Sequence, residues 1–227
     1  MRLWVGRISY WSDGGLMYDL SELIARSIER ARQLETSGIY FLGDVSDQAA
    51  EHMGQALTSM AVQREGDAEQ PITIYINSGG GSVGAGLAMM QIIYRLRSLY
   101  NVTINTVVTG YAYSMGAVIF QAGDRRLMGS FSTMMLHSPQ WQLSGDDEKV
   151  FNDYADLARH YKNLVSNIFF QRSGKHTAAW WESYIYSGRD RFLTAQECIE
   201  LGLADEIYGL QLTSPPPSAV GEGNLEL

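Results

Sequence analysis

The acidic residues of this chain are unevenly distributed: it has 25 of them, yet none occurs between Gln70 and Asp124. This stretch contains two β-branched runs, 72–76 and 102–108, and each run leads into a glycine-rich turn followed by a helical pattern. Strands that alternate with helices predict βαβ units and a mainly parallel sheet. Because buried elements offer few places for carboxylates, we expect the acid-free stretch to form the centre of an α/β fold.

Hydrophobic spacing and capping residues predict the other elements. Ser46 is the expected N-cap of one helix, and Thr194 with Glu197 forms the capping box of another. The longest helix is expected over about 146–171, ahead of Gly174, with an apolar stripe of Val150, Tyr154, Leu157, Tyr161, Leu164 and Ile168. The remaining expected elements are helices beginning near residues 19, 86 and 114, and strands at 39–42 and 132–137.

The chain is expected to divide into three parts. Residues 1–38 form an N-terminal arm and a helix, and the arm carries Trp4 and Trp11, which suit docking on a neighbouring molecule. Residues 39–212 form the main domain. Residues 213–227 include three consecutive prolines among Ser, Gly and Glu, and such a segment buries too little apolar surface to offset its ordering entropy. We therefore predict a disordered tail.

Composition excludes several classes of protein. The net charge of −8 argues against a nucleic-acid partner, since phosphate contacts need basic patches. Cys198 is the single cysteine, which excludes a disulfide framework and any multi-cysteine metal site, and we expect no metal and no cofactor. The chain shows no secretory signal pattern and no apolar run near the ~20 residues that span a bilayer. This predicts a cytoplasmic protein with no membrane partner.

The first glycine turn, from Gly79 to Gly84, matches the G-x-G-x-x-G fingerprint of dinucleotide-binding proteins. That fingerprint needs an acidic residue about 20 positions further on, and here the next acid is Asp124. A bound nucleotide is therefore not expected. The turn exposes backbone N–H groups that suit an anion or oxyanion, and the alternative is that its glycines only permit close packing of strand and helix.

The second glycine turn places Ser114 at the start of a helix, where free N–H groups and the helix dipole stabilise negative charge. Ser114 is either an N-cap or a nucleophile, and the turn is not a G-x-S-x-G elbow because Ala112 stands two positions before it. His137 is the candidate general base because it follows a buried strand, and a core histidine is the alternative. The other three histidines are expected to face solvent: His52, His160 and His176.

These motifs together resemble the family of the Clp protease proteolytic subunit (ClpP). The resemblance is carried, in the family's order, by Ile76–Val83, Gly110–Ala117, Met135–Pro139, Asp190–Glu197 and Gly202–Ile207. It covers about 39–208. It implies a ClpP/crotonase-like α/β fold of repeated βαβ units with a mainly parallel sheet, in which the helix at about 146–171 is a protruding handle that stacks two heptameric rings.

The resemblance also implies roles for individual residues. Ser114 corresponds to the family's nucleophile and His137 to its general base, while Gly81 and Met115 correspond to the backbone donors of the oxyanion hole. The implied activity is that of a serine endopeptidase without a cofactor, acting in a closed chamber. The implied partners are an AAA+ unfoldase ATPase, other ClpP-like subunits in heptameric rings, and unfolded polypeptide as substrate.

The sequence departs from the family at the third catalytic position. Aligned on Asp190–Phe192, the family's catalytic aspartate falls on Tyr186. A tyrosine can orient His137 by a hydrogen bond but brings no negative charge for the imidazolium, so reduced activity is expected. Asp190 is the less favoured alternative. The surface that receives the ATPase also differs, because Thr73 stands where the family usually has an aromatic residue.

Three functions stay open on this basis. The leading one is a serine endopeptidase subunit of a stacked-ring protease. The second is a weakly active or inactive structural subunit of a mixed ring, which Tyr186 favours and the retained Ser114 and His137 oppose. The third is an acyl-CoA hydratase or isomerase of the crotonase type, which also holds an oxyanion with two backbone donors but needs no Ser–His pair.

Overall fold

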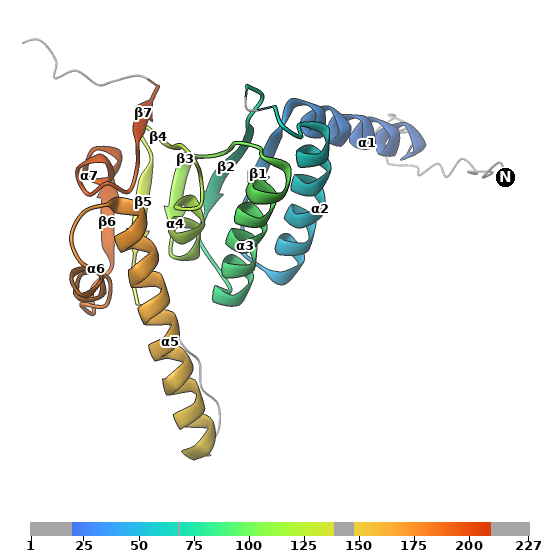
Figure 1. The fold of residues 1–227 in the computed structure, drawn as a ribbon. Helices are drawn as coiled ribbons and strands as arrows, with labels where there is room; N and C mark the ends of the chain where they lie inside the picture. The colour runs from blue at the N-terminus through green and yellow to red at the C-terminus, as the bar shows by residue number, and fades with distance from the viewer. Residues whose placement is uncertain (1–19, 68, 139–147, 210–227) are drawn as a thin grey trace, which may run out of the picture.

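The computed structural model describes residues 20–67, 69–138 and 148–209. They form an α/β fold around one mainly parallel sheet, as predicted (Figure 1). Its strands pair in the order β1-β2-β3-β4-β7, with β5 on β3 and β6 on β5, and only the β5–β6 pair is antiparallel among them. The strands are β1 (Ile39–Leu42), β2 (Ile72–Ser78), β3 (Ile104–Tyr113), β4 (Arg126–Gly129), β5 (Thr133–Leu136), β6 (Arg191–Thr194) and β7 (Glu206–Tyr208).

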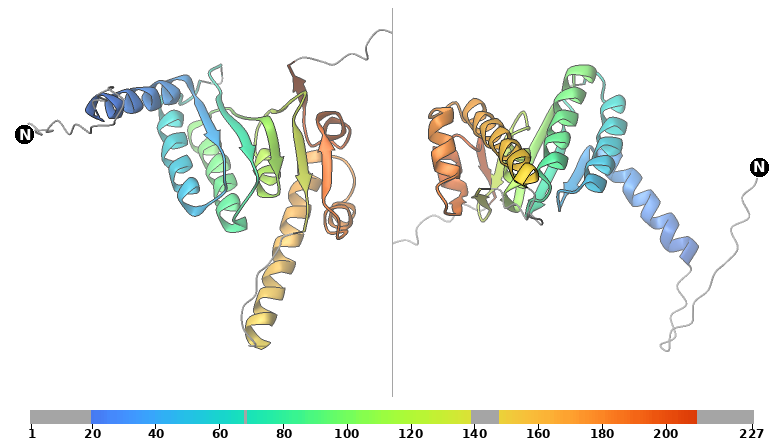
Figure 2. Two further views of the ribbon diagram at one scale, coloured as in Figure 1. Left: turned by 180° about the vertical axis from the view of Figure 1, so that it is seen from behind. Right: turned by 90° about the horizontal axis from the view of Figure 1, so that it is seen from below.

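The acid-free stretch forms the centre of this sheet, which confirms the first prediction. It contains β2, β3 and the helices that follow them, and Ile72, Ile74 and Ile76 of β2 are fully buried. The helices are α1 (Leu20–Ser37), α2 (Asp47–Gln63), α3 (Val83–Tyr100), α4 (Met115–Phe120), α5 (Glu148–Ser173), α6 (Ala178–Ile185) and α7 (Ala195–Glu200). Figures 1 and 2 show α2, α3 and α4 together on one face of the sheet.

Strand β3 is longer than predicted and changes its partner along its length. Residues 106–108 pair with β4, whereas 111–113 pair with β5. Gly110 therefore lies inside the strand and not in a turn, which corrects the expectation from sequence. The Asn77 side chain explains the glycine, since a Cβ at Gly110 would lie 2.4 Å from its Oδ1. This switch of partner brings the ends of β3 and β5 side by side.

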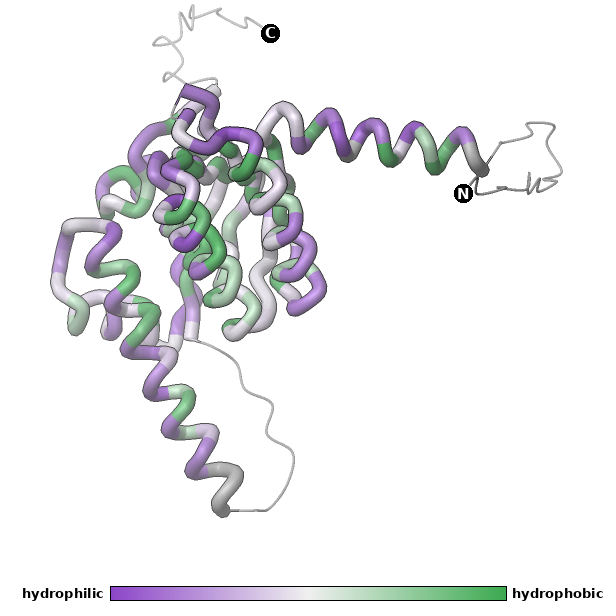
Figure 3. Tube along the Cα trace, turned by 45° about the vertical axis from the view of Figure 1, so that its right-hand side comes forward, coloured by the Kyte–Doolittle hydropathy of each residue, from purple (hydrophilic) through white to green (hydrophobic). Residues whose placement is uncertain are grey.

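Two helices project from the body of the molecule. Helix α5 extends beyond the sheet at one end and α1 extends sideways at the other (Figures 1 and 2). Along both, hydrophobic and hydrophilic residues alternate in Figure 3. The bounds of α5 match the predicted handle within two residues. In this single chain Tyr154 and Leu157 of the predicted stripe are exposed, whereas Val165 and Phe169, which lie outside the stripe, are buried.

Several short elements escaped prediction, namely β4, β6, β7 and α6. Each is eight residues or shorter, so hydrophobic spacing carries little signal for it. The expected caps are present: Ser46 accepts a hydrogen bond from Ala49 N, and Thr194 and Glu197 form the capping box of α7. The N-terminal arm and the C-terminal tail fall outside the described residues. None of the helices in the described part of the chain is long and apolar enough to cross a membrane.

Candidate active site

Three neighbouring strands of the sheet end at the same edge, and each is followed by a candidate residue. Strand β2 ends before the turn Gly79–Gly81, β3 before Ser114, and β5 before His137. Because β2 pairs with β3 in parallel and β3 with β5 in parallel, their carboxyl ends meet at one edge. This is where ligands bind in open parallel α/β sheets.

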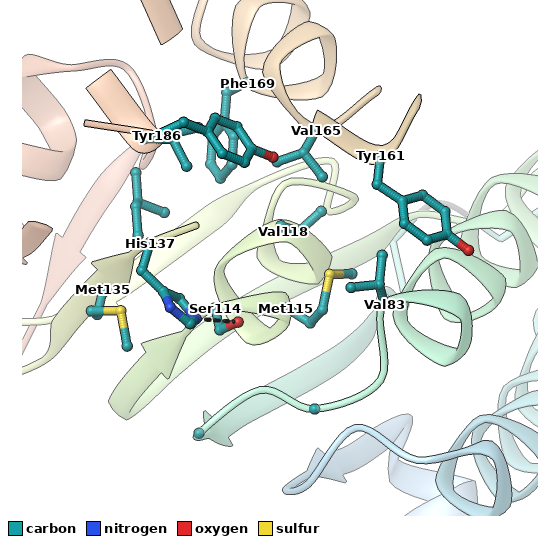
Figure 4. Close-up of a pocket in the computed structure, with 14 residues that line it drawn as sticks. Val83, Ser114, Met115, Val118, Met135, His137, Tyr161, Val165, Phe169 and Tyr186 are labelled. Atoms are coloured by element: carbon teal, nitrogen blue, oxygen red, sulfur yellow. Dashed lines mark hydrogen bonds between the residues drawn. The ribbon is translucent and has the colours of Figure 1, made fainter. Parts of the chain in front are cut away.

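Ser114 and His137 are in direct contact. Nε2 of His137 lies 2.9 Å from Oγ of Ser114, within hydrogen-bond distance, and the hydroxyl is the donor in the tautomer that carries its proton on Nδ1 (Figure 4). Ser114 occupies the N-cap position of α4, but its side chain makes no capping hydrogen bond. Ser114 is thus the N-cap residue by position but does not cap the helix with its side chain, since its hydroxyl faces the histidine.

The backbone of Ser114 adopts a conformation that few side chains tolerate. Its φ and ψ are 53° and −121°, and it is one of three non-glycine residues with positive φ in the described part of the chain. Its N–H donates to the carbonyl of Met135, which holds the turn against β5. Conformations of this kind cost about 1–3 kcal/mol and persist where the surroundings fix them, most often at functional sites.

The glycine turn after β2 packs directly against the start of α4. A Cβ at Gly80 would lie 2.7 Å from Cβ of Ser114 and 3.1 Å from N of Met115. Gly81 has φ +145°, and a Cβ there would lie 2.1 Å from the carbonyl oxygen of Val45. Close packing therefore requires these glycines, and the same packing places the Gly79–Gly81 turn beside Ser114.

Gly81 and Met115 carry the two N–H groups that the resemblance assigns to an oxyanion hole. Met115 is the first residue of α4, so its N–H has no acceptor within the helix. Among the described residues, neither N–H donates to an acceptor in a turn or loop. Both residues line the same pocket as Ser114 and His137. Two unused donors beside a serine hydroxyl suit an oxygen that gains negative charge during acyl transfer.

The pocket beside the serine has a volume of about 330 Å³ and largely apolar walls. One wall comes from α5 and the end of α6, which supply Tyr161, Val165, Phe169 and Ile185 (Figure 4). The sequence did not reveal this wall. The spacing of 161, 165 and 169 is helical, but which face of α5 turns toward the sheet depends on the angle at which that helix packs.

Tyr186 lines the same pocket but does not contact His137. In Figure 4 its hydroxyl points toward Val165 of α5, away from the imidazole. Burial raises the pKa of the Tyr186 phenol to about 12, with a further contribution from the charge of Glu182, so the phenol is neutral at physiological pH. Nζ of Lys162 lies 5.4 Å from the centre of its ring.

The described part of the site holds no carboxylate at the position of a third triad member. None of the residues lining the pocket is Asp or Glu, and Asp190 is exposed. The hydrogen bond to Ser114 is the single one found for His137 within the described residues. The other three histidines are exposed, as predicted, and His176 stacks on Trp180 with ring centres 3.7 Å apart.

A parallel α/β sheet with a strained serine, a histidine and free N–H donors at its carboxyl edge is the architecture of a hydrolase. The Clp protease family model matches residues 24–211 of the chain. This chain therefore belongs to the Clp protease family, whose members named below are peptidase subunits.

Curated relatives agree with this assignment. The chain is 34% identical over 193 residues to the ATP-dependent Clp protease proteolytic subunit 2 of Thermobifida fusca (strain YX), covering 83% of this chain and 87% of that protein. It is 32% identical over 179 residues to the ATP-dependent Clp protease proteolytic subunit of Ligilactobacillus salivarius (strain UCC118), covering 78% and 85%. The corresponding subunit of Pleurastrum terricola is 29% identical over 169 residues, covering 74% and 81%.

Proposed function

We propose that this chain is a serine endopeptidase with Ser114 as nucleophile and His137 as general base. The observation that carries the proposal is the 2.9 Å hydrogen bond between Nε2 of His137 and Oγ of Ser114. In addition, Gly81 and Met115 line the same pocket as Ser114 and His137. Membership of a peptidase family favours a peptide bond as the target.

The chemistry follows from these groups. Oγ of Ser114 attacks the carbonyl carbon of the peptide bond while its proton passes to Nε2 of His137. The carbonyl oxygen becomes an oxyanion, which accepts hydrogen bonds from the N–H groups of Gly81 and Met115. His137 then donates the proton to the leaving amine, and an acyl group stays on Ser114. Water, deprotonated by His137, releases the acyl group and restores the serine.

The absence of a carboxylate partner for His137 in the described site lowers the proposed rate. In the serine proteases that use an aspartate, replacing that group by a neutral amide lowers turnover by about 10⁴. Tyr186 supplies no charge here, because its phenol is neutral and its hydroxyl points away from His137. We propose a slow peptidase whose activity depends on the Ser–His pair and the backbone donors.

We further propose that the chain assembles with other subunits of its family into stacked heptameric rings. Residues 39–212 then form the peptidase domain and α5 the handle between the rings. The projection of α5 away from the sheet and the exposure of Leu157 support this role. We propose further that an AAA+ ATPase delivers unfolded polypeptide to these rings in the cytoplasm. The words "ATP-dependent" in the relatives' names support the dependence on ATP.

A second candidate function is that of a weakly active structural subunit in a mixed ring. The orientation of Tyr186 favours it, because the one residue at the position of the family's acid does not reach the histidine. The strained backbone of Ser114 opposes it, since a subunit without chemistry gains nothing from that strain.

Hydrolysis of fluorogenic peptides by the purified full chain tests the proposal. We expect measurable turnover that falls to background in Ser114→Ala and in His137→Ala, while His52→Ala, an exposed histidine on α2, keeps the wild-type rate. Turnover that survives in Ser114→Ala contradicts the proposed nucleophile. A chain that is inactive alone but supports turnover when mixed with an active relative favours the structural subunit.

A further inference from the structure

A second pocket, of about 620 Å³, lies at the edge of the sheet opposite Ser114. It is lined by Thr103, just before β3 begins, whereas Ser114 follows the end of β3. Ten residues of strand separate the two sites, which is roughly 30 Å at the usual rise per residue. Helices α3 and α5 run antiparallel to the parallel strands in Figure 1, so their C-terminal turns bring Arg97 and Arg172 to this pocket.

Two guanidinium groups and one carboxylate line this pocket, and Arg126, which pairs with Asp205, adjoins it by donating to the carbonyl of Arg172. Asp124 uses both of its oxygens, because Oδ1 accepts from Arg97 and Oδ2 accepts from the backbone N–H of Ile104 at 2.9 Å. Asp205 is likewise committed to Arg126, which donates from Nε at 3.1 Å and from a terminal nitrogen at 2.5 Å. Each carboxylate therefore neutralises one arginine.

Arg172 is left with no carboxylate partner among the described residues. One terminal nitrogen donates to the carbonyl of Gly123 at 2.6 Å, while Nε is buried without any partner. Burial lowers the pKa of Arg172, and the positive charge of Arg126 lowers it further; Tyr94 and Asp205 act in the opposite direction, Arg97 lowers it again, and the net shift is downward. The surroundings of Arg172 thus disfavour its positive charge, yet an arginine stays charged at neutral pH. An anion bound beside Arg172 would therefore be stabilised by this charge.

The rest of the pocket wall supplies hydrogen-bond donors. Hydroxyl groups come from Tyr94, Ser98 and Thr103, and an amide comes from Asn101, whose left-handed backbone (φ 51°) ends α3. The one carboxylate in the wall, Asp124, is already occupied. Hydroxyls and an amide around an unneutralised guanidinium match the oxygen atoms of a phosphate or a carboxylate.

We propose that this pocket binds a small oxyanion, phosphate or carboxylate, between Arg172 and Arg97. The anion balances the one excess positive charge of the cluster and accepts hydrogen bonds from the surrounding hydroxyl groups. The site is separate from the Ser114 pocket and does not depend on peptidase activity.

Thermal unfolding of the full chain in chloride, acetate and phosphate at equal ionic strength tests the site. We expect a saturable rise of several degrees in the midpoint with phosphate, with acetate, or with both, over millimolar concentrations. A response to phosphate alone assigns the site to phosphate, and a response to acetate assigns it to carboxylates. Arg172→Met should abolish the rise, while Arg125→Met, which removes an exposed partner of Glu206, should keep it.

A second variant keeps the test decisive if Arg172→Met does not fold. Ser98→Asp places a carboxylate in the pocket wall, so we expect a higher midpoint in chloride and no further rise with phosphate or acetate. Two results overturn the proposal: a wild-type midpoint that is equal in all three salts, or a rise in Arg172→Met as large as that in wild type. In either case Arg97 and Arg172 serve only to bind the carbonyls of Ala122 and Gly123 in the loop between α4 and β4.

Discussion

At the scale of single residues, close packing determines the backbone conformations of the site as much as the proposed chemistry does. Gly80 and Gly81 allow the turn after β2 to touch both Val45 and the start of α4. Ser114 has a strained backbone with positive φ, and in this conformation its hydroxyl lies against His137. The sequence motifs predicted Ser114 and His137 as candidates, the resemblance to the family added Gly81 and Met115, and all four line one pocket.

Gly81→Ala should damage both the fold and the activity. The new Cβ would lie 2.1 Å from the carbonyl oxygen of Val45 at a φ of +145°, so the turn must move and carry its N–H away from Ser114. We expect the free energy of unfolding to fall by about 2–3 kcal/mol and peptide hydrolysis to fall by about 10²–10³. Gly79→Ala is the matched control, since a Cβ there meets no atom within 4 Å. Equal effects of the two substitutions would contradict this account.

Tyr186→Asp should raise peptide hydrolysis, by about tenfold or more, because a carboxylate near His137 stabilises the imidazolium. The substituted side chain starts from the pocket wall, so a rearrangement of the end of α6 is needed to reach the ring. Tyr186→Phe is the control and should leave the rate within about twofold, since the present hydroxyl does not touch His137. A loss of activity in Tyr186→Phe would mean that the phenol hydroxyl takes part after all.

At the scale of elements, long periodic segments were predictable and short edge elements were not. The capping residues Ser46 and Thr194 located α2 and α7, and the run 72–76 located β2, because these signals are local. Strand β6 carries no such signal, since its four residues gain their conformation by pairing with β5. The apolar pocket wall was missed for a related reason: it depends on how α5 and α6 pack together.

The ion pair between Arg126 of β4 and Asp205, just before β7, gives stability a defined pH dependence. Burial works to raise the pKa of Asp205, but hydrogen bonds and charge from Arg126 outweigh it and leave that pKa below the ordinary value. A depressed pKa in the folded state means that the pair stabilises the protein above the unfolded-state pKa of about 3.9. This contribution is lost as the pH falls through the folded-state pKa.

Asp205→Asn should therefore lower the free energy of unfolding at pH 7 and weaken its decline in acid. We expect a loss of about 2 kcal/mol, less than for a fully buried pair because the Asp205 side chain is 40% exposed while that of Arg126 is 6% exposed. Urea unfolding between pH 3 and about 7 measures both effects. Glu206→Gln removes the neighbouring exposed pair with Arg125 and should cost less than about 1 kcal/mol. If the free energy of unfolding of Asp205→Asn falls in acid as steeply as that of the wild type, other carboxylates cause the pH dependence.

At the scale of the whole molecule, the sheet is a compact platform with a projecting helix at each end. Leu23, Ile24 and Ile28 on α1 and Leu157 on α5 expose apolar side chains on these projections. Their exposure in a single chain fits the proposed assembly into rings, in which neighbouring subunits would cover them. Assembly into rings leaves no local sequence motif. The composition indicates it only by the share of charged residues, which is 19%, below the roughly 25% of typical soluble domains.

The most direct test of the central claim is covalent labelling of the full chain with a fluorophosphonate probe, followed by peptide mass spectrometry. The account predicts one adduct on Ser114, and a labelling rate at least about 100-fold lower in His137→Ala, because the histidine removes the proton from the nucleophile. A folded, assembled protein whose Ser114 stays unlabelled, or one in which another residue takes the probe, would contradict it.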